Sequence, residues 1–436
     1  MSVAPTLERS RLEGRTVDLL RRLIQIDTTN PPGNERAAQE LLAERLRRVG
    51  FECELVGVER ARPNLVARLR ARSDGPVLAF LGHVDTVLAD PSDWSCDPWS
   101  GELRDGHVWG RGALDMKGQV AAEVVAAESL AAAGWRPSSG ELRLILTCDE
   151  EAGGALGARW LCEQRPDLAR SDFVINEGGG ETFTLGGQRY WSVGVGEKGV
   201  FRFRVRARGR AGHASTPGLA DNALAKLAPV LSRLAAAGTV PLASASLRPL
   251  LEALGESPAA LVASAGADDR LVALLEPMLG VTFAPTMASG SPKINVIPAR
   301  AELRVDCRVP PGVERSEVLR VIREVVGDGD FEVAVDETTD GSLSPAEGPL
   351  FEAICEFCER EAPRARPLPT LLPGFTDSRW FRAAFPECVA YGFFPQLAMD
   401  MVDAAQLIHG ADERVPVADL GLAAACYVEL AERLLR

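Results

Sequence analysis

The sequence predicts an α/β protein in which a mostly parallel sheet carries helices on both faces and a smaller α+β unit is inserted into the chain. Two short, almost continuous apolar runs, 76–85 and 141–150, are typical of strands buried on both faces, and an Ala-rich helical stretch, 118–133, separates them. Further along, apolar and charged residues alternate at 200–209 and 301–309, which indicates antiparallel strands with one solvated face. A length of 436 residues also favours two domains over one.

The other elements follow from the same two periodicities. The expected helices and strands outside those runs are helices at 12–28, 35–49, 221–237, 314–326 and 417–435, a helical insertion at 243–279, and strands at 173–176 and 331–337. We therefore assign 1–197 and 339–436 to a larger domain and 198–338 to the inserted one.

The composition narrows the class of protein. A formal net charge of −13, with basic and acidic residues interspersed, argues against nucleic acid or an anionic membrane as partner. We expect no signal peptide and no membrane span, because no long apolar run is present. Nine cysteines at irregular spacing do not form a disulfide framework, and the lone CxxC of Cys355 and Cys358 falls in a helical pattern. A cytoplasmic location is the expectation.

Polar residues with metal-ligand chemistry follow the predicted strands. His83 and Asp85 in GHVDT point the same way from a strand end, and a carboxylate beside a metal-bound imidazole is a common arrangement. Asp115 lies in the Gly-flanked GRGALDMKG. Taken singly, a structural histidine and a turn-forming aspartate remain the alternatives.

Three further segments supply acids and a second imidazole. Glu150 and Glu151 stand side by side after an apolar run, Glu177 follows another, and His409 precedes the last helix. Adjacent carboxylates repel one another unless a cation or solvent compensates. Two histidines and three carboxylates can hold two divalent ions if one carboxylate bridges, and Glu150 then remains as general base and acid. The candidate ligands are His83, Asp115, Glu151, Glu177 and His409.

Six motifs in order carry a family resemblance. GHVDTV, GRGALDMKG, TCDEEAGG, the later Glu177, GHASTP and the terminal HG together resemble the zinc metallopeptidase family of aminoacylase-1, carboxypeptidase G, carboxypeptidase S and succinyl-diaminopimelate desuccinylase. The likeness runs from about residue 15 to the C-terminus. It implies that His83 and Glu177 bind one zinc ion, that Glu151 and His409 bind the other, and that Asp115 bridges them, with cobalt or manganese as possible substitutes.

The resemblance also assigns catalytic roles. Asp85 would orient His83, and Glu150 would take a proton from the attacking water and pass it to the leaving nitrogen. The family tends to show a cis peptide after the bridging aspartate, here Asp115–Met116. His107 in RDGHVWGRG matches no ligand position and is interpreted as a structural loop residue.

The inserted domain resembles the family's lid, which often also forms its dimer interface. His213 would stabilise the oxyanion, in some relatives across the dimer, and Asn295 with Arg308 would hold the substrate carboxylate. Gly374 would lie near that carboxylate, with Phe375 where many relatives carry a small residue. The alternative for Arg308 is an ion pair on the strand surface. A substrate held by lid and main domain together would favour a closed state.

The resemblance implies hydrolysis of the amide bond of an N-acyl-L-amino acid by a homodimer. A carboxypeptidase or dipeptidase acting on a short peptide with a free carboxylate is the main alternative. The desuccinylase interpretation ranks lower, because the loops around the lid look closer to the carboxypeptidase S and aminoacylase branch. A non-catalytic relative would be expected to lack a ligand or the base, and a serine hydrolase lacks support because no GxSxG is present.

Overall fold

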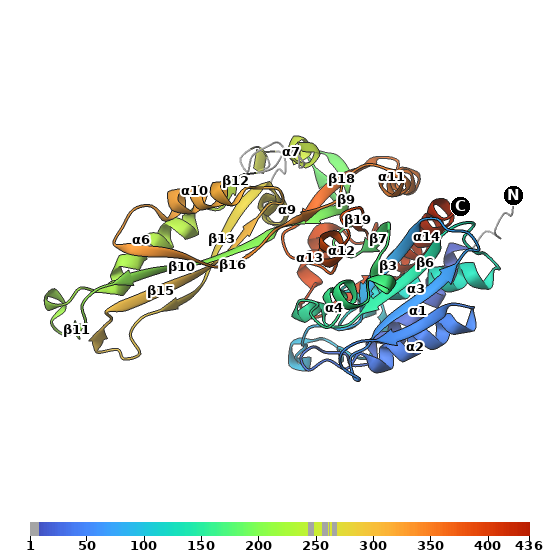
Figure 1. Ribbon diagram of the computed structural model, residues 1–436, viewed down its shortest axis with the longest axis horizontal. Helices are drawn as coiled ribbons and strands as arrows, with labels where there is room; N and C mark the ends of the chain where they lie inside the picture. Colours follow the sequence, from blue (N-terminus) through green and yellow to red (C-terminus); the bar gives the residue numbers. More distant parts are fainter. Residues whose placement is uncertain (1–7, 243–247, 255–259, 261, 264–267) are drawn as a thin grey trace. The chain divides into compact units, whose positions relative to one another are not determined.

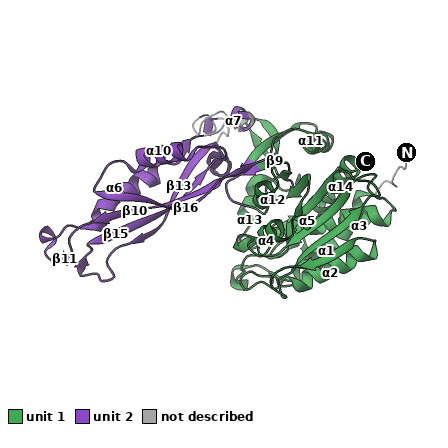
Figure 2. Cartoon of the chain, in the orientation of Figure 1, with its two compact units in different colours: residues 1–195, 344–370, 376–436 green, residues 196–343, 371–375 purple. Residues whose placement is uncertain are grey.

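The computed structural model describes residues 8–242, 248–254, 260, 262–263 and 268–436. It divides the chain into two compact units (Figure 2). Unit 1 comprises Met1–Val195, Ser344–Thr370 and Thr376–Arg436, and unit 2 comprises Gly196–Leu343 and Leu371–Phe375. The short segment 371–375 thus lies in unit 2, whereas the sequence-based boundaries assigned it to the larger domain.

Part of the helical insertion expected at 243–279 lies outside the described residues, namely 243–247, 255–259, 261 and 264–267. Its described parts include α7 (Arg248–Leu254) and α9 (Asp269–Leu275).

The main sheet is parallel at its centre. Its strand order is β1 (Glu52–Val56), β2 (Asn64–Arg70), β6 (Glu141–Thr147), β3 (Val77–His83), β7 (Phe173–Asn176), β19 (Val389–Gly392), β9 (Gln188–Glu197) and β17 (Ser342–Leu343), with β8 (Thr182–Leu185) and β18 (Ala365–Leu372) also paired to β9. Strands β6, β3, β7 and β19 pair in parallel, and β1 and β2 add an antiparallel edge. Nearly every residue of β3 and β6 is buried, as the apolar runs predicted.

Helices cover both faces of this sheet (Figure 1). They are α1 (Arg9–Ile24), α2 (Arg36–Arg48), α3 (Lys117–Ala132), α4 (Ala158–Gln164), α5 (Pro166–Ala169), α11 (Pro349–Glu361), α12 (Ser378–Ala384), α13 (Met401–Leu407) and α14 (Val417–Leu434), with short 3₁₀ turns η1 (Pro91–Asp93) and η2 (Glu150–Ala152). Alternate residues of β3 reach opposite layers: the Phe80 ring lies 5.3 Å from that of Tyr427 on α14, whereas Leu81 packs in the cluster that contains Phe381 of α12. The predicted fold class is confirmed.

The helix expected at 12–28 ends earlier, at Ile24. Thr28 Oγ1 donates to the main-chain O of Val84, and Asn30 N donates to that of Thr86. These tertiary hydrogen bonds hold the segment extended beside the end of β3, where an amphipathic pattern alone predicted another helical turn.

A small antiparallel sheet joins the C-terminal segment to the centre of unit 1. It consists of β4 (Glu102–Arg104), β5 (His107–Trp109) and β20 (Arg414–Pro416). Arg414 pairs with Trp109 in this ladder. Residues just before Arg414 are thereby brought close to the loop that follows Trp109.

Unit 2 is an antiparallel sheet with helices on one face. The strand order is β12 (Thr239–Pro241), β13 (Gly280–Ser289), β15 (Arg300–Val309), β10 (Gly199–Arg208) and β16 (Phe331–Thr339), accompanied by α6 (Ala223–Ala236), α10 (Arg315–Val326), η3 (Pro217–Leu219), η5 (Glu276–Leu279) and the small pair β11 (Gly212–His213) and β14 (Val296–Ile297). Phe203 and Val205 of β10 are buried against α6 and α10, whereas Arg202 and Arg206 are exposed. This is the alternation that the sequence predicted.

No helix among the described residues has the length and apolar character needed to cross a membrane. All nine cysteines are free, and Cys355 and Cys358 lie on α11, as the helical pattern predicted.

Candidate metal centre

His83 is held in the orientation of a metal ligand. It ends β3, its side chain is 1% exposed, and its Nδ1 lies 3.0 Å from the main-chain O of Asp85. Because Nδ1–H donates to this carbonyl, the lone pair of the neutral ring is on Nε2. The Asp85 carboxylate is 3.5 Å from Nδ1, so the orienting hydrogen bond goes to the backbone of Asp85.

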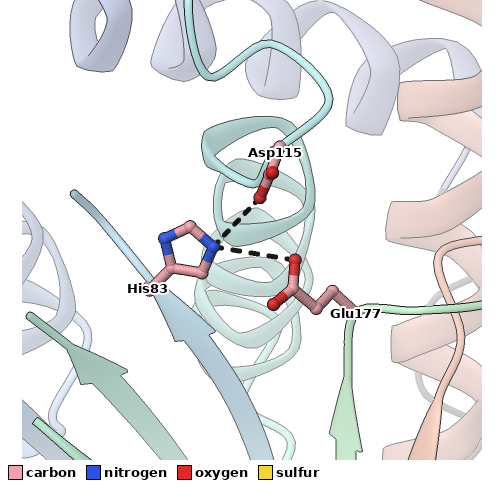
Figure 3. Close-up of side chains that lie close together, drawn as sticks. All are labelled: His83, Asp115 and Glu177. Carbon is pink, nitrogen blue, oxygen red and sulfur yellow. Dashed lines mark hydrogen bonds and ion pairs between the residues drawn. The ribbon is translucent and has the colours of Figure 1, made fainter. Parts of the chain in front are cut away.

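Two clusters of ligands share one carboxylate. His83 Nε2 is 3.1 Å from Oδ1 of Asp115 and 3.6 Å from Oε2 of Glu177 (Figure 3). His409 Nε2 is 3.0 Å from the other oxygen of Asp115 and 3.3 Å from Oε2 of Glu151. Within each cluster the ligand atoms lie within 4.8 Å of one another. The structure therefore brings all five candidate ligands together, with one oxygen of Asp115 in each cluster.

The topology explains how residues far apart in sequence meet. β6, β3 and β7 are parallel neighbours, so their carboxyl ends lie at the same edge of the sheet, which is where ligands gather in such folds. His83 ends β3, Glu151 lies on η2 just after β6, and Glu177 directly follows β7. Asp115 precedes α3, and the Asp115–Met116 bond is cis, as expected.

The donor set fits divalent cations. Glu151 Oε1 is buried and has no hydrogen-bond partner within the part of the chain that the structure describes. Three carboxylates share the site with two imidazoles, an excess of negative charge that a cation offsets. Nitrogen and oxygen ligands suit zinc, cobalt and manganese. His83 is 1% exposed and His409 55% exposed, so the cluster that contains His409 is the one open to water.

Electrostatics in the metal-free chain point the same way. Burial alone would lower the pKa of His83, but the carboxylates of Glu177 and Asp115 raise it well above its ordinary value. Burial acts to raise the pKa of Asp115, but hydrogen bonds from His409 and His83 hold it far below the usual range. Burial raises the pKa of Glu151. Without a cation, protons neutralise this site, and a divalent ion would displace them.

Asp85 organises the loop that carries the acids. Its buried carboxylate accepts hydrogen bonds from the main-chain N of Glu150 and of Glu151, each at 3.2 Å, and from Asn30 Nδ2 at 2.9 Å. Asp149, just before, has a left-handed φ of 69°, which turns the chain sharply after β6. Asp85 thus links the His83 strand to the loop of the second cluster.

Glu150 belongs to neither cluster, but the charges of the cluster residues act on its carboxyl group. Burial, followed by the charge of Glu177, raises its pKa well above the ordinary value. A carboxyl group with a raised pKa beside metal ligands is suited to proton transfer. His107 is also outside both clusters, and its Nδ1 pairs with the main-chain O of Asp105 at 2.7 Å.

Arg308 and the segment of Gly374 lie together in unit 2. The Arg308 guanidinium is 5.2 Å from the centre of the Phe375 ring, and its Nε donates to Oδ1 of Asp306 at 2.6 Å. Nη1 of Arg308 is buried and has no hydrogen-bond partner among the described residues. The surface ion pair considered for Arg308 is present, and it leaves one end of the guanidinium free for an anion.

His213 and Asn295 lie at the other end of unit 2. Ala214 N donates to the main-chain O of Asn295, beside His213, where β11 pairs with β14. The label β11 marks this end of unit 2 in Figure 1. Arg308 pairs with Val200 near one end of the β10–β15 ladder, and Arg300 ends it at the other, eight residues or about 26 Å away. Within one chain's unit 2, Arg308 and Asn295 are therefore not brought together.

The sequence did not identify three buried residues around the centre. Asn30 holds Asp85, and the pair of Glu413 and Arg111 contacts the loops of Asp115 and His409. Each is a single polar residue in a loop, where no periodicity marks it. The NPPG that begins at Asn30 and the proximity of Glu413 to His409 were the available signals.

Comparison with known proteins gives a family match over most of the chain. Residues 79–433 match the model of "Peptidase family M20/M25/M40". A succinyl-diaminopimelate desuccinylase of Rhodospirillum centenum is 30% identical over 429 residues, which cover 96% of this chain and 96% of the relative.

Solved structures show the same fold. The M20 family metallo-carboxypeptidase Sso-CP2 from Sulfolobus solfataricus has a TM-score of 0.69 at 17% identity, covering 96% of this chain and 99% of the other. The Bacillus subtilis YXEP protein, described as a dinuclear metal binding peptidase from the M20 family, has a TM-score of 0.61 at 16% identity, covering 98% and 99%.

We expect metal affinity to rise with pH. In the metal-free chain, hydrogen bonding to Asp115 raises the pKa of His409 to about 10, and burial raises that of Glu177 to about 8. Both groups hold a proton at pH 7 that a cation must displace, so affinity should increase by up to about tenfold per pH unit for each proton released, and level off above these pKa values. Titration calorimetry in buffers of different ionisation enthalpy counts the protons that are released. A metal affinity that does not change between about pH 6 and 8 would contradict this prediction.

Proposed function

The chain belongs to peptidase family M20/M25/M40 and hydrolyses amide bonds, and we propose that its substrate is an N-acyl-L-amino acid, which it cleaves to a carboxylate and a free amino acid. The observation that carries this proposal is the pair of ligand clusters sharing Asp115, with Glu150 as an acid of raised pKa that belongs to neither cluster. Two bound divalent ions, zinc by family habit, would polarise the scissile carbonyl and make water a nucleophile at neutral pH.

Glu150 moves the proton. Its carboxylate would take a proton from the attacking water and deliver it to the leaving nitrogen. Without this proton the nitrogen would have to leave as an unstable anion, which is a poor leaving group. The main-chain N of Glu150 is anchored by Asp85, so the side chain starts from a fixed point. This anchoring supports a role for Asp85 in placing both the His83 strand and the base.

Arg308 recognises the free carboxylate of the substrate. Its buried Nη1 lacks a partner among the described residues, and a substrate carboxylate would satisfy this donor. Gly374, next to Phe375 and therefore near the guanidinium, leaves space for the substrate. The Phe375 ring beside Arg308 would leave less room for the substrate carboxylate than the small residue of many relatives would.

His213 supplies a donor for the oxyanion. Ser215 N donates to Nδ1 of His213 at 3.2 Å, so the neutral ring carries its proton on Nε2 and can donate it. Arg308 is separated by about 26 Å of the β10–β15 ladder from the end of unit 2 that carries His213 and Asn295. One small substrate therefore cannot contact Arg308 and these two residues in a single unit 2. We propose that a second copy of the chain provides His213 and Asn295.

Unit 2 offers a surface for that second copy. β12 covers β13 only at Gly280–Thr282, so the outer edge of Phe283–Ser289 has no strand partner within the described residues. An unpaired strand edge with apolar neighbours is a template for pairing with an identical chain. The exposed apolar side chains of this region are Leu219, Leu224, Leu231, Met287, Ile294 and Val296.

The alternative functions differ in the group that the substrate carries on the acyl side of the cleaved amide bond. A carboxypeptidase or dipeptidase would use Arg308 in the same way, and the likeness to Sso-CP2 keeps this alternative open. The loop sequences ranked a desuccinylase lower, whereas the Rhodospirillum centenum relative supports it, and succinyl-diaminopimelate is itself an N-acyl amino acid. Nine free cysteines support a reducing compartment, and we propose the cytoplasm.

A substrate screen tests the proposed function. With zinc or cobalt present, we expect turnover of N-acetyl amino acids, dipeptides or succinyl-diaminopimelate, with N-acyl amino acids best. The methyl ester of the best substrate should lose at least about tenfold in kcat/KM, since a hydrogen bond to a charged group contributes about 1.5–3 kcal/mol. If none of the three classes is hydrolysed, the proposal fails.

Replacing the base should separate chemistry from metal binding. We expect Glu150→Ala to lower kcat by about 100- to 10,000-fold, because general acid–base catalysis contributes that much, while two metal ions per chain remain bound. Elemental analysis of the purified variant is the control. Activity close to that of the unaltered enzyme would show that another group is the base.

Mixing two inactive variants tests whether His213 acts in the partner. Glu150→Ala and His213→Ala chains, mixed and allowed to exchange subunits, form heterodimers in which one site has both residues intact. We expect recovery of roughly one quarter of the activity of the unaltered dimer, since half of the dimers are mixed and each has one complete site. No recovery, with heterodimers verified by mass spectrometry, would indicate that His213 acts in its own chain.

A further inference from the structure

Glu413 and Arg111 form a buried ion pair between two metal-ligand loops. The Glu413 side chain is completely buried, and Oε2 accepts from Arg111 Nη1 at 2.6 Å and from Gly112 N at 2.9 Å. Its other oxygen accepts from Leu114 N at 2.7 Å and from Asp115 N at 3.0 Å. All four donors come from 111–115, the loop that ends in the shared ligand.

The same ion pair reaches the turn that carries His409. Arg111 Nη2 donates to the main-chain O of Gly410 at 2.9 Å, and the O atoms of His409 and Leu88 lie at 3.3 and 3.4 Å. The guanidinium also lies over the Trp94 ring, 5.1 Å from its centre. One buried guanidinium and one buried carboxylate therefore bond to the backbones of both loops.

The turn needs such support. His409 and Asp412 have positive φ angles of 61° and 58°, a conformation that costs free energy in residues other than glycine. The pairing of Arg414 with Trp109 already brings the two segments together. The ion pair adds direct contacts to the two ligand residues, because it bonds to the main-chain N of Asp115 and to the main-chain O of His409.

We propose that Glu413 and Arg111 are positioning residues for the cluster of Asp115, Glu151 and His409, and that they set the separation of Asp115 and His409 at which this cluster holds its ion. The proposal rests on the proposed two-metal function. The cluster of His83 and Glu177 depends on them less, because His83 is oriented by Asp85.

The test is metal stoichiometry in Glu413→Gln. Glutamine keeps the size of the side chain, but its NH₂ group would face main-chain N–H donors of 112–115 instead of accepting from them. We expect the affinity for one of the two cobalt ions to fall by about 10- to 100-fold, the usual effect of losing a residue that supports a metal ligand, while the other ion stays bound. Calorimetry and the visible spectrum of the cobalt form both report this, independently of activity.

A matched control is available in the same unit. Arg143 and Glu141 form another buried ion pair, with a 2.6 Å contact, on β6. Glu141→Gln should leave both cobalt ions bound with unchanged affinity. Should Glu413→Gln fail to fold, Arg111→Lys decides, because lysine keeps the charge but cannot form the fork that joins Glu413 to Gly410.

Two results would overturn the proposal. One is a folded Glu413→Gln or Arg111→Lys chain that binds two ions as tightly as the unaltered chain. The other is equal weakening of both ions at an unchanged melting temperature, which would show that the pair does not act on one cluster. An unaltered chain that binds fewer than two ions refutes the proposed function itself, before any variant is compared.

Discussion

The structure depends on a carboxylate shared between two imidazoles. Asp115 presents one oxygen to His83 and the other to His409, and a carboxylate oxygen of Glu177 and one of Glu151 each lie within 4.8 Å of an oxygen of Asp115. Such a concentration of buried acids is stable only with compensating positive charge. The parallel sheet supplies three of the ligands at one edge, and the small sheet of β4, β5 and β20 brings the C-terminal segment that supplies the fourth beside Asp115.

Much of this centre could be predicted from the sequence, for a physical reason. His83 ends a buried strand, Glu151 and Glu177 follow two others, and strand ends in a parallel sheet converge. Asp115 and His409 lie in loops with no such signal; their residue types made them candidate ligands, and the resemblance to a known family gave each its place in the site. The mostly parallel sheet with helices on both faces was predictable because apolar runs and an Ala-rich helix alternate along the chain.

The remainder depends on tertiary contacts that no local pattern encodes. Glu413 is one acid in ADERVP, and although it follows closely after His409, no local pattern indicates that it accepts from four donors of a loop about 300 residues away. The separation of Asn295 from Arg308 had a signal, since the strand expected at 301–309 implies an extended chain between them. Considering the two residues as one clamp overlooked that geometry, and the second copy of the chain that we propose would resolve the conflict.

The two ligand clusters differ in their exposure, and this difference makes the residues that support the exposed cluster important. His83 is sealed in the sheet edge, and its orientation is fixed by the strand and by the backbone of Asp85. His409 is more than half exposed and sits on a turn with a left-handed backbone, so neither packing nor regular structure fixes it. An exposed cluster lets water and substrate approach, but its histidine lacks the packing that would hold the side chain in place. The buried pair of Glu413 and Arg111 combines access with a fixed ligand position, because it bonds to the backbone of the His409 turn from the buried side and leaves the imidazole itself exposed.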